Sequence, residues 1–292
     1  MSDEVILYDL PSKQGTSWSL NPWKTRLVLN YKSIPYKTEW TEYPDLKPKF
    51  EKFLITTAWP WPGPVFLSLV RLDQSVTIPS AQRPGQAAMV CEKVTANCAC
   101  VQSGIPPNQT GAGAAYSSPA IRMPDGSYVM DSRRIADALE SLQPTPPLHL
   151  DSPYQARIED LTKQIVDSIR PVFMPLVPKV FLNPTSRDYF VSTRTKALGM
   201  SLDEYAKGAD EGVQKAKPYI RELGELLREN NEGPFLQGKT PCYADMIVLG
   251  WLTMLDRLGV GDSFFGLEDG GEELKRLYDE GVKQGWFERD SY

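Results

Sequence analysis

The first forty residues alternate between strand-like and helix-like patterns of apolar positions. Residues 5–8 form a short β-prone apolar run, and Pro11 and Gly15 after it indicate a loop. From Trp23 onward, apolar side chains recur at helical spacing among basic and polar ones. Residues 34–40 then alternate between two faces, as a strand does. We predict a β-loop-α-β order in which a helical crossover joins two parallel strands.

A second group of elements follows farther along the chain. Residues 119–123 and 127–130 are β-prone and flank Pro124-Asp-Gly126, which predicts a hairpin. Residues 131–140 begin with polar side chains and continue with apolar ones at helical spacing, which predicts a capped helix. A proline-rich stretch at 144–147 ends this part. Beyond it helical patterns dominate, as in residues 158–169, 202–230 and 243–258. The pattern therefore predicts an α/β domain over residues 1–142 and an all-α domain over residues 151–292.

One segment, at about residues 54–103, breaks this pattern. It lacks helical or strand periodicity, has few charges and contains Cys91, Cys98 and Cys100. A structureless loop of this length is unusual inside a compact domain. A metal cluster is one interpretation of the cysteines, but only Cys98 and Cys100 are closely spaced, so we favour an insertion with incidental cysteines and predict no metal. A further hypothesis is that the segment is translated intron sequence.

Composition narrows the possible functions. The 292 residues are 41% hydrophobic and 24% charged, as in folded globular proteins, and the net charge of −5 argues against a nucleic-acid partner. The acidic N-terminus and the lack of a long apolar run predict no secretory signal and no membrane span. Four cysteines do not suggest a disulfide framework, so a cytoplasmic location is expected. His149 is the single histidine, which leaves little material for histidine-based catalysis.

Three short motifs carry the functional signal. Residues 19–29, Ser-Leu-Asn-Pro-Trp-Lys-Thr-Arg-Leu-Val-Leu, open the first predicted helix. Ser118-Pro119 begins a predicted strand, and Asp131-Ser132 opens the next helix. In this order, with the β-α-β and ββα halves around them, they resemble the glutathione transferase superfamily. In sequence, residues 8–26 and 233–252 are most similar to the fungal Ure2-like group and to the fungal members related to bacterial β-etherases. The resemblance covers residues 1–53 and about 104–290.

The resemblance implies a thioredoxin-like N-terminal domain, an all-α C-terminal domain, a homodimer, and glutathione as co-substrate. Ser19 lies where family members place the residue that contacts the glutathione sulfur. A hydroxyl at a helix N-terminus donates a hydrogen bond to a thiolate, and the helix dipole adds to this stabilisation, which lowers the thiol pKa. The alternative is that Ser19 is only an N-cap, and Ser17 is the nearest rival for the catalytic role.

The other two motifs are expected to hold the rest of the tripeptide. The family has a cis-proline at the position of Pro119, which turns the backbone of Ser118 toward the cysteinyl part of glutathione. Valine is commoner than serine before this proline. Asp131 and Ser132 correspond to the acidic-Ser pair that holds the γ-glutamyl end. As a plain capping pair, these two residues would need no ligand.

The family places a capping box at residues 242–245, where Cys242 is a poor cap and Thr240 a possible substitute. Several aromatic residues either line a pocket for a hydrophobic co-substrate or belong to the core; they are Trp18, Trp23, Tyr116 and Phe173. The expected function is attack of the glutathione thiolate on a hydrophobic electrophile by conjugation, aryl-ether cleavage or peroxide reduction. The alternatives are a non-catalytic ligand-binding or regulatory protein on the same fold, and a translation factor-like or structural module that binds no glutathione.

Overall fold

The computed structural model describes residues 4–55, 105, 107–108 and 115–289. The segment predicted as an insertion at 54–103, with Cys91, Cys98 and Cys100, therefore lies outside the described residues except for its first two positions. Those two positions continue the helix α2 (Tyr43–Ile55).

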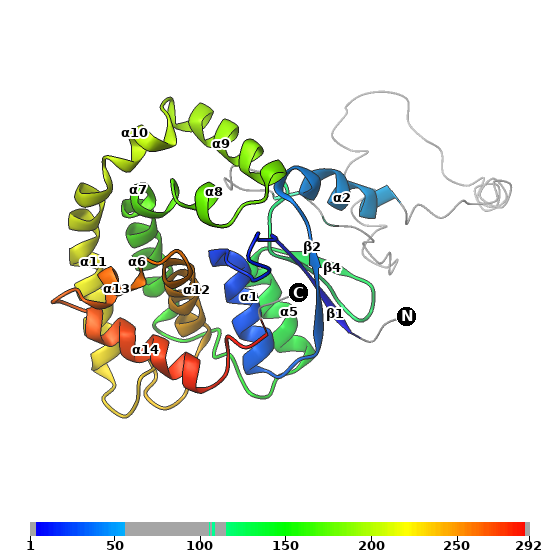
Figure 1. The fold of residues 1–292 in the computed structure, drawn as a ribbon. Coiled ribbons are helices and arrows are strands. Elements are labelled where there is room, and N and C mark those ends of the chain that lie inside the picture. The colour runs from blue at the N-terminus through cyan, green and yellow to red at the C-terminus, as the bar shows by residue number, and fades with distance from the viewer. Residues whose placement is uncertain (1–3, 56–104, 106, 109–114, 290–292) are drawn as a thin grey trace, which may run out of the picture.

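A four-stranded sheet forms the N-terminal half (Figure 1). Its strands are β1 (Val5–Asp9), β2 (Tyr36–Trp40), β3 (Ala120–Arg122) and β4 (Tyr128–Met130), in the order β2-β1-β3-β4. β1 and β2 are parallel and are joined by α1 (Leu20–Tyr31), as the β-α-β pattern predicts. β3 pairs antiparallel with both β1 and β4, which confirms the predicted hairpin.

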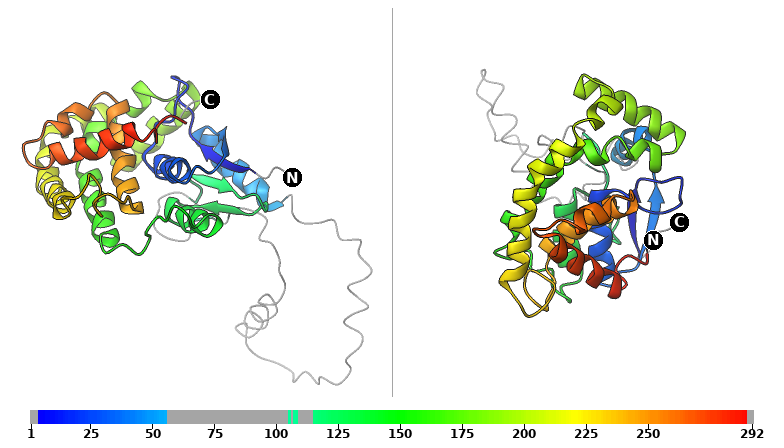
Figure 2. Two further views of the ribbon diagram at one scale, coloured as in Figure 1. Left: turned by 90° about the horizontal axis from the view of Figure 1, so that it is seen from below. Right: turned by 60° about the vertical axis from the view of Figure 1, so that its left-hand side comes forward.

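Helices cover both faces of the sheet. Alternate side chains of a strand point to opposite faces. Asp9 of β1 contacts Arg26 of α1, whereas the ring of Tyr8 packs on Phe50 of α2 with their centroids 5.6 Å apart. α1 and α5 (Ser132–Leu142) therefore lie side by side on one face and α2 lies on the other (Figures 1 and 2).

The C-terminal half is helical. Its elements are α6 (Gln155–Ser168), α7 (Arg170–Phe173), α8 (Val177–Val180), α9 (Pro184–Leu198), α10 (Leu202–Ala206), α11 (Ala209–Glu229), α12 (Tyr243–Arg257), α13 (Gly261–Phe265) and α14 (Gly271–Lys283). This arrangement confirms an α/β thioredoxin-like half followed by an all-α half. The helix predicted over 202–230 is instead two helices, α10 and α11, with Lys207 and Gly208 between them; a Cβ atom at Gly208 would lie 3.8 Å from the Pro171 ring.

The helix α12 is the centre of the helical half, since every residue from Tyr243 to Leu255 is buried. It packs directly against α1. A Cβ atom at Gly250 would lie 3.0 Å from the Leu20 carbonyl oxygen, so only glycine allows the two helices to approach this closely. The contact places the start of α1 beside the helical half.

The proline-rich stretch at 144–147 is fixed to the end of α1. The buried Lys32 ammonium donates hydrogen bonds to the carbonyl oxygens of Gln143 and Pro146, at 2.7 and 2.6 Å, and pairs with Glu140. Beyond the prolines, the Leu148 carbonyl accepts a hydrogen bond from the Tyr243 N–H. The stretch breaks the helical pattern, as predicted, and its backbone connects the two halves.

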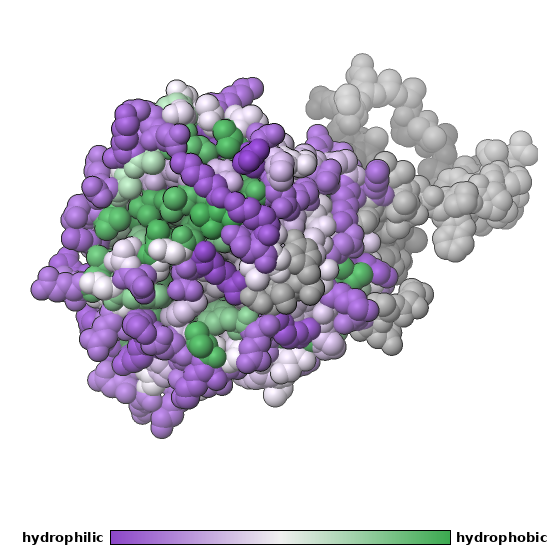
Figure 3. All heavy atoms as spheres, in the orientation of Figure 1, coloured by the Kyte–Doolittle hydropathy of each residue, from purple (hydrophilic) through white to green (hydrophobic). Residues whose placement is uncertain are grey.

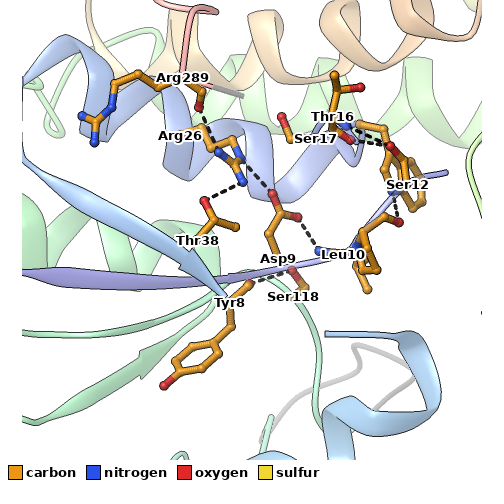
Figure 4. A network of polar contacts seen from close by, with 12 residues as sticks. Tyr8, Asp9, Leu10, Ser12, Thr16, Ser17, Arg26, Thr38, Ser118 and Arg289 are labelled. Carbon is orange, nitrogen blue, oxygen red and sulfur yellow. Dashed lines mark hydrogen bonds and ion pairs between the residues drawn. The ribbon is translucent and has the colours of Figure 1, made fainter. Parts of the chain in front are cut away.

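A buried ion pair joins the sheet to α1 (Figure 4). The Arg26 Nε atom lies 2.8 Å from Asp9 Oδ2, and both side chains are at most 1% exposed. The remaining Arg26 nitrogens donate to Thr38 of β2 at 3.0 Å and to the Arg289 carbonyl at 2.9 Å. Asp9 Oδ1 also accepts the N–H of Leu10 at 2.6 Å. Four separated segments thus meet at one guanidinium.

We predict that Asp9→Ala lowers the free energy of unfolding by about 3–5 kcal/mol, because it leaves the Arg26 charge buried without its partner. Urea denaturation followed by circular dichroism measures the effect. The control is Asp279→Ala, which removes an exposed ion pair to Lys275 and is expected to cost roughly 1 kcal/mol or less. Equal losses in the two variants would contradict the structural role given to Asp9.

Candidate functional site

The loop before α1 is held in place by contacts at several points. Ser12 Oγ donates to the Thr16 carbonyl at 2.6 Å and accepts the Thr16 N–H at 3.2 Å. The Trp18 indole donates to the Pro11 carbonyl, and its ring stacks on Phe181 with 5.0 Å between centroids. These contacts fix the direction in which the chain enters α1.

Ser19 is the N-cap of α1, with extended backbone angles, and its side chain makes no capping hydrogen bond. The hydroxyl is half-buried and lines a cavity between the two halves of the molecule. The backbone of Ser19 therefore occupies the N-cap position, as the capping interpretation requires, but the hydroxyl does not cap the helix.

Ser17 lies differently. It is fully buried, and it is not among the residues that line this cavity. Its carbonyl oxygen accepts a hydrogen bond from Arg257 at 2.8 Å, whereas its hydroxyl has no partner among the described residues. Of the two serines, the structure brings Ser19 to the cavity.

The Ser118-Pro119 peptide bond is cis. Neither residue is among those lining the cavity. Ser118 Oγ donates to the Tyr8 carbonyl at 3.1 Å, which ties this turn to β1 (Figure 4). The Pro119 carbonyl accepts the Asp131 N–H at 3.4 Å, which joins the second predicted motif to the third. Within the described part of the chain, the backbone N–H and C=O of Ser118 make no hydrogen bond.

Asp131 and Ser132 both line the cavity. Asp131 has a φ of 85°, a value that residues other than glycine rarely adopt and that concentrates at functional sites. Its Oδ1 atom caps α5 by accepting the N–H groups of Arg133 and Arg134, at 2.9 and 3.2 Å. The capping interpretation therefore holds for Asp131, and its backbone is strained at the same position.

The cavity has a volume of about 550 Å³. One wall comes from the starts of α1 and α5, and the others come from the helical half. On the face shown in Figure 3, apolar residues gather in one patch in the region of α7 and α8. The apolar lining residues include Trp18, Val166, Phe173, Met174, Val177, Phe190, Ile247 and Met254.

The structure assigns two of the four aromatic residues considered above to the cavity and the other two to the core. Trp18 and Phe173 line the cavity. Trp23 is buried in the core, with Arg257 over its ring, and Tyr116 packs against Phe50 on the α2 side of the sheet.

Lys24 is a lining residue that the sequence motifs did not single out. Burial lowers its pKa from 10.5 to about 8, although the carboxylates of Asp131 and Glu159 favour its charged form. Among the described residues, no carboxylate lies within ion-pair distance of its ammonium. Its position in the motif, one turn after Ser19, was the only signal available from the sequence.

Tyr243 brings the helical half into contact with the third motif. It lines the cavity at the start of α12, and the Ser132 side chain lies close to its hydroxyl. Burial raises the pKa of Tyr243, so its hydroxyl stays protonated at neutral pH and is available as a donor.

The capping box at the start of α12 is formed through Asp245. This fully buried carboxylate accepts the N–H groups of Cys242 and Leu236, at 2.8 and 2.9 Å. Burial raises the pKa of Asp245 to about 6. Thr240, considered as a substitute cap, is exposed, and the N-cap is Cys242.

The described residues contain no group of three histidine, cysteine or acidic side chains arranged to hold a metal ion. They also contain no helix that is both long and apolar enough to cross a membrane.

Two family models match this chain, and both describe one family. The glutathione S-transferase N-terminal domain matches residues 18–142, and the glutathione S-transferase C-terminal domain matches residues 154–264. The fold, with its thioredoxin-like half and helical half, agrees with both. The chain belongs to the glutathione S-transferase family.

Individual relatives agree with this assignment. The glutathione S-transferase-like protein ustS of Aspergillus flavus is 28% identical over 284 residues, which cover 93% of this chain and 86% of the relative. Among solved structures, the glutathione transferase GSTFuA2 of Phanerochaete chrysosporium has a TM-score of 0.68 at 22% identity, with 99% of this chain and 100% of that chain covered. The glutathione S-transferase CsGST63524 of Ceriporiopsis subvermispora, in complex with glutathione, has a TM-score of 0.65 at 24% identity, with 97% and 98% covered. These two structural likenesses concern the fold.

The unused Ser19 hydroxyl leads to a prediction about stability. We expect Ser19→Ala to change the free energy of unfolding by less than about 0.5 kcal/mol, because it removes no capping hydrogen bond. The control is Ser201→Ala at the start of α10, where the hydroxyl accepts the Glu204 N–H and its loss is expected to cost roughly 1 kcal/mol. Denaturation of both variants side by side measures the difference. A larger loss at Ser19 than at Ser201 would restore the capping interpretation.

Proposed function

We propose that this protein is an active glutathione transferase in which Ser19 activates the glutathione thiol. One observation carries the proposal: the Ser19 hydroxyl stands at a helix N-terminus, takes no part in capping and lines the same cavity as Asp131 and Ser132. Such a hydroxyl donates to a thiolate, and the positive end of the helix dipole favours the same charge.

The remaining residues of the proposed site hold the tripeptide. The backbone N–H and C=O of Ser118, which have no hydrogen-bond partner among the described residues, pair with the cysteinyl backbone of glutathione as an added strand beside the cis peptide. Ser132 and the N–H groups at the start of α5 bind the γ-glutamyl carboxylate, and Asp131 attracts the γ-glutamyl ammonium. Lys24, charged below its pKa of about 8, faces the same end of the site and adds a positive charge for that carboxylate.

The thiolate held in this way attacks an electrophile bound against the apolar helical walls of the cavity. The electron pair on sulfur forms the new bond, and the thiol proton is released when the thiolate forms. Conjugation, aryl-ether cleavage and peroxide reduction share this first step. Because the residue at the thiol is serine rather than cysteine, transfer is favoured over disulfide exchange with the protein. The homodimer and the cytoplasmic location expected from the sequence stay predictions.

The second candidate is a non-catalytic ligand-binding or regulatory protein on the same fold, since a fold does not by itself fix an activity. The two candidates differ in one measurable respect. The binder retains glutathione without turning over any model electrophile, and the loss of the Ser19 hydroxyl does not change that retention.

We predict that Ser19→Ala raises the pKa of bound glutathione by about 1–2 units, because a hydrogen bond to a charged group contributes roughly 1.5–3 kcal/mol. Turnover at pH 7 should fall by about 10- to 100-fold. Ultraviolet titration of the thiolate in the complex measures the pKa, and assay with a chlorodinitrobenzene measures the rate.

The matched control is Ser17→Ala. Ser17 lies two residues before Ser19, and its buried hydroxyl has no hydrogen-bond partner among the described residues. It should leave both the thiol pKa and the rate close to those of the wild type. Loss of activity at Ser17 rather than Ser19 would refute the assignment of the thiol-activating residue.

The lowered pKa of Lys24 predicts how glutathione affinity depends on pH. Below pH 8 the ammonium is charged, and affinity for S-methylglutathione should be constant; above pH 8 the free protein loses this charge, and affinity should fall by up to about tenfold per pH unit. Calorimetry from pH 6.5 to 9.5 measures the profile. Lys24→Arg keeps its charge in this range, so its profile should lose the step near pH 8, whereas identical profiles would exclude a role for Lys24.

A further inference from the structure

The charge of the cavity is opposite to that of the protein. The chain has a net charge of −5, but among the described residues the cavity is lined by five basic and three acidic side chains. The basic ones are Lys24, Arg133, Lys163, Arg170 and Arg194, and the acidic ones are Asp131, Glu159 and Asp167.

Most of these charges are already paired. Asp167 binds both Arg170 at 2.7 Å and Lys163 at 3.1 Å, and Arg133 lies 3.7 Å from Glu159. Two cations are left without a carboxylate in the described part of the chain, Lys24 and Arg194. Lys24 faces Asp131 and the end of the site assigned to the γ-glutamyl group, so its charge is accounted for by the proposed function.

Arg194 lies elsewhere, on α9, among aromatic rings. Its guanidinium carbon is 4.4 Å from the centre of the Phe190 ring and 5.5 Å from that of Tyr43. Burial raises the pKa of Tyr43 to about 12. The positive charge of Arg194 opposes that rise, because it favours the ionised form of the Tyr43 hydroxyl. Among the described residues, the only hydrogen bond of the Arg194 side chain is the one that it donates to the neighbouring Thr193 hydroxyl.

This arrangement is connected to the thiol site. The ring of Tyr43 lies 6.5 Å from that of Trp18, and Trp18 directly precedes Ser19. A planar guanidinium has its N–H groups in a rigid fork, which matches a carboxylate or similar anion. The neighbouring walls, with Met174 and Val177, are apolar and suit a ring.

Resting on the proposed transferase function, we infer that the second substrate is an anionic aromatic electrophile, whose acidic group binds Arg194 while its ring lies on the apolar wall beside Ser19. In the reaction, the glutathione sulfur forms a bond to the electrophilic carbon and the leaving group departs with the electron pair of the broken bond. Arg194 takes no part in these bonds; it positions the substrate.

The test uses a matched pair of electrophiles, 4-chloro-3,5-dinitrobenzoate and its methyl ester. Both lose chloride when the thiolate attacks, and they differ in the carboxylate. For the wild type we take the ratio of kcat/KM for the acid to kcat/KM for the ester, with each value divided by the uncatalysed rate of that electrophile. This ratio should be at least about ten. Arg194→Gln should bring this ratio close to one through the KM of the acid, and Arg194→Lys should keep part of it.

Arg170→Gln is the charge control, because it removes an equal charge from the same cavity at a residue that is already paired. It should preserve the preference for the acid. Loss of the preference in both variants would indicate a diffuse field rather than binding at Arg194 and would overturn the inference. A wild type that does not prefer the acid would overturn it as well.

Two outcomes separate this inference from the proposed function. If Arg194→Gln raises the KM for glutathione and leaves the ratio unchanged, Arg194 binds a glutathione carboxylate and the inference fails while the transferase function stands. If the wild type turns over neither electrophile, the proposed function fails for them. Calorimetric binding of the acid and the ester to wild type and Arg194→Gln then decides the question, and equal affinities refute anion binding at Arg194.

Discussion

The buried pair between Asp9 and Arg26 is the constraint on which the position of the site depends. An unpartnered charge is costly in a protein interior, so the two side chains hold β1 and α1 at a fixed distance and rotation. Because Arg26 also binds Thr38 and the Arg289 carbonyl, the same contact fixes β2 and the end of the chain. The start of α1, with Ser19, is thereby placed at the edge of the sheet facing the helical half. The close approach of Gly250 to Leu20 then brings α12 against it and forms the cavity wall.

The elements that sequence reasoning predicted correctly depend on local signals. The parallel crossover follows from strand and helix periodicity, the hairpin from Pro124-Asp-Gly126, and the start of α5 from Asp131. The unbroken helix predicted over 202–230 was wrong, since the chain leaves the helix at Lys207 and Gly208, and Gly208 lies beside Pro171, a residue far away in sequence. Periodicity within one segment contains no information about such a partner.

The same limit applies to the candidate site. The sequence placed Ser17 and Ser19 two residues apart in one loop and had no means of choosing between them. Arg257, 240 positions away, donates a hydrogen bond to the Ser17 carbonyl, and the Ser17 hydroxyl is buried. Lys24 likewise reads as an ordinary polar position on an amphipathic helix. Only the approach of α12 to α1 buries it and lowers its pKa. The motifs identify where glutathione is expected to bind, but the cations around it are defined by tertiary packing.

The unpaired cations also explain how one cavity is suited to two different ligands. In the proposed function, glutathione brings a carboxylate to the end of the cavity that Asp131, Ser132 and Lys24 line, and its thiolate lies at the helix start. Arg194 is separated from this end by the aromatic side chains of Trp18 and Tyr43. A second anion that bound beside the first without a cation of its own would be repelled by the thiolate that must attack it. A guanidinium at the aromatic end removes this repulsion, because it balances the charge of the electrophile locally while leaving the helix dipole free to act on sulfur.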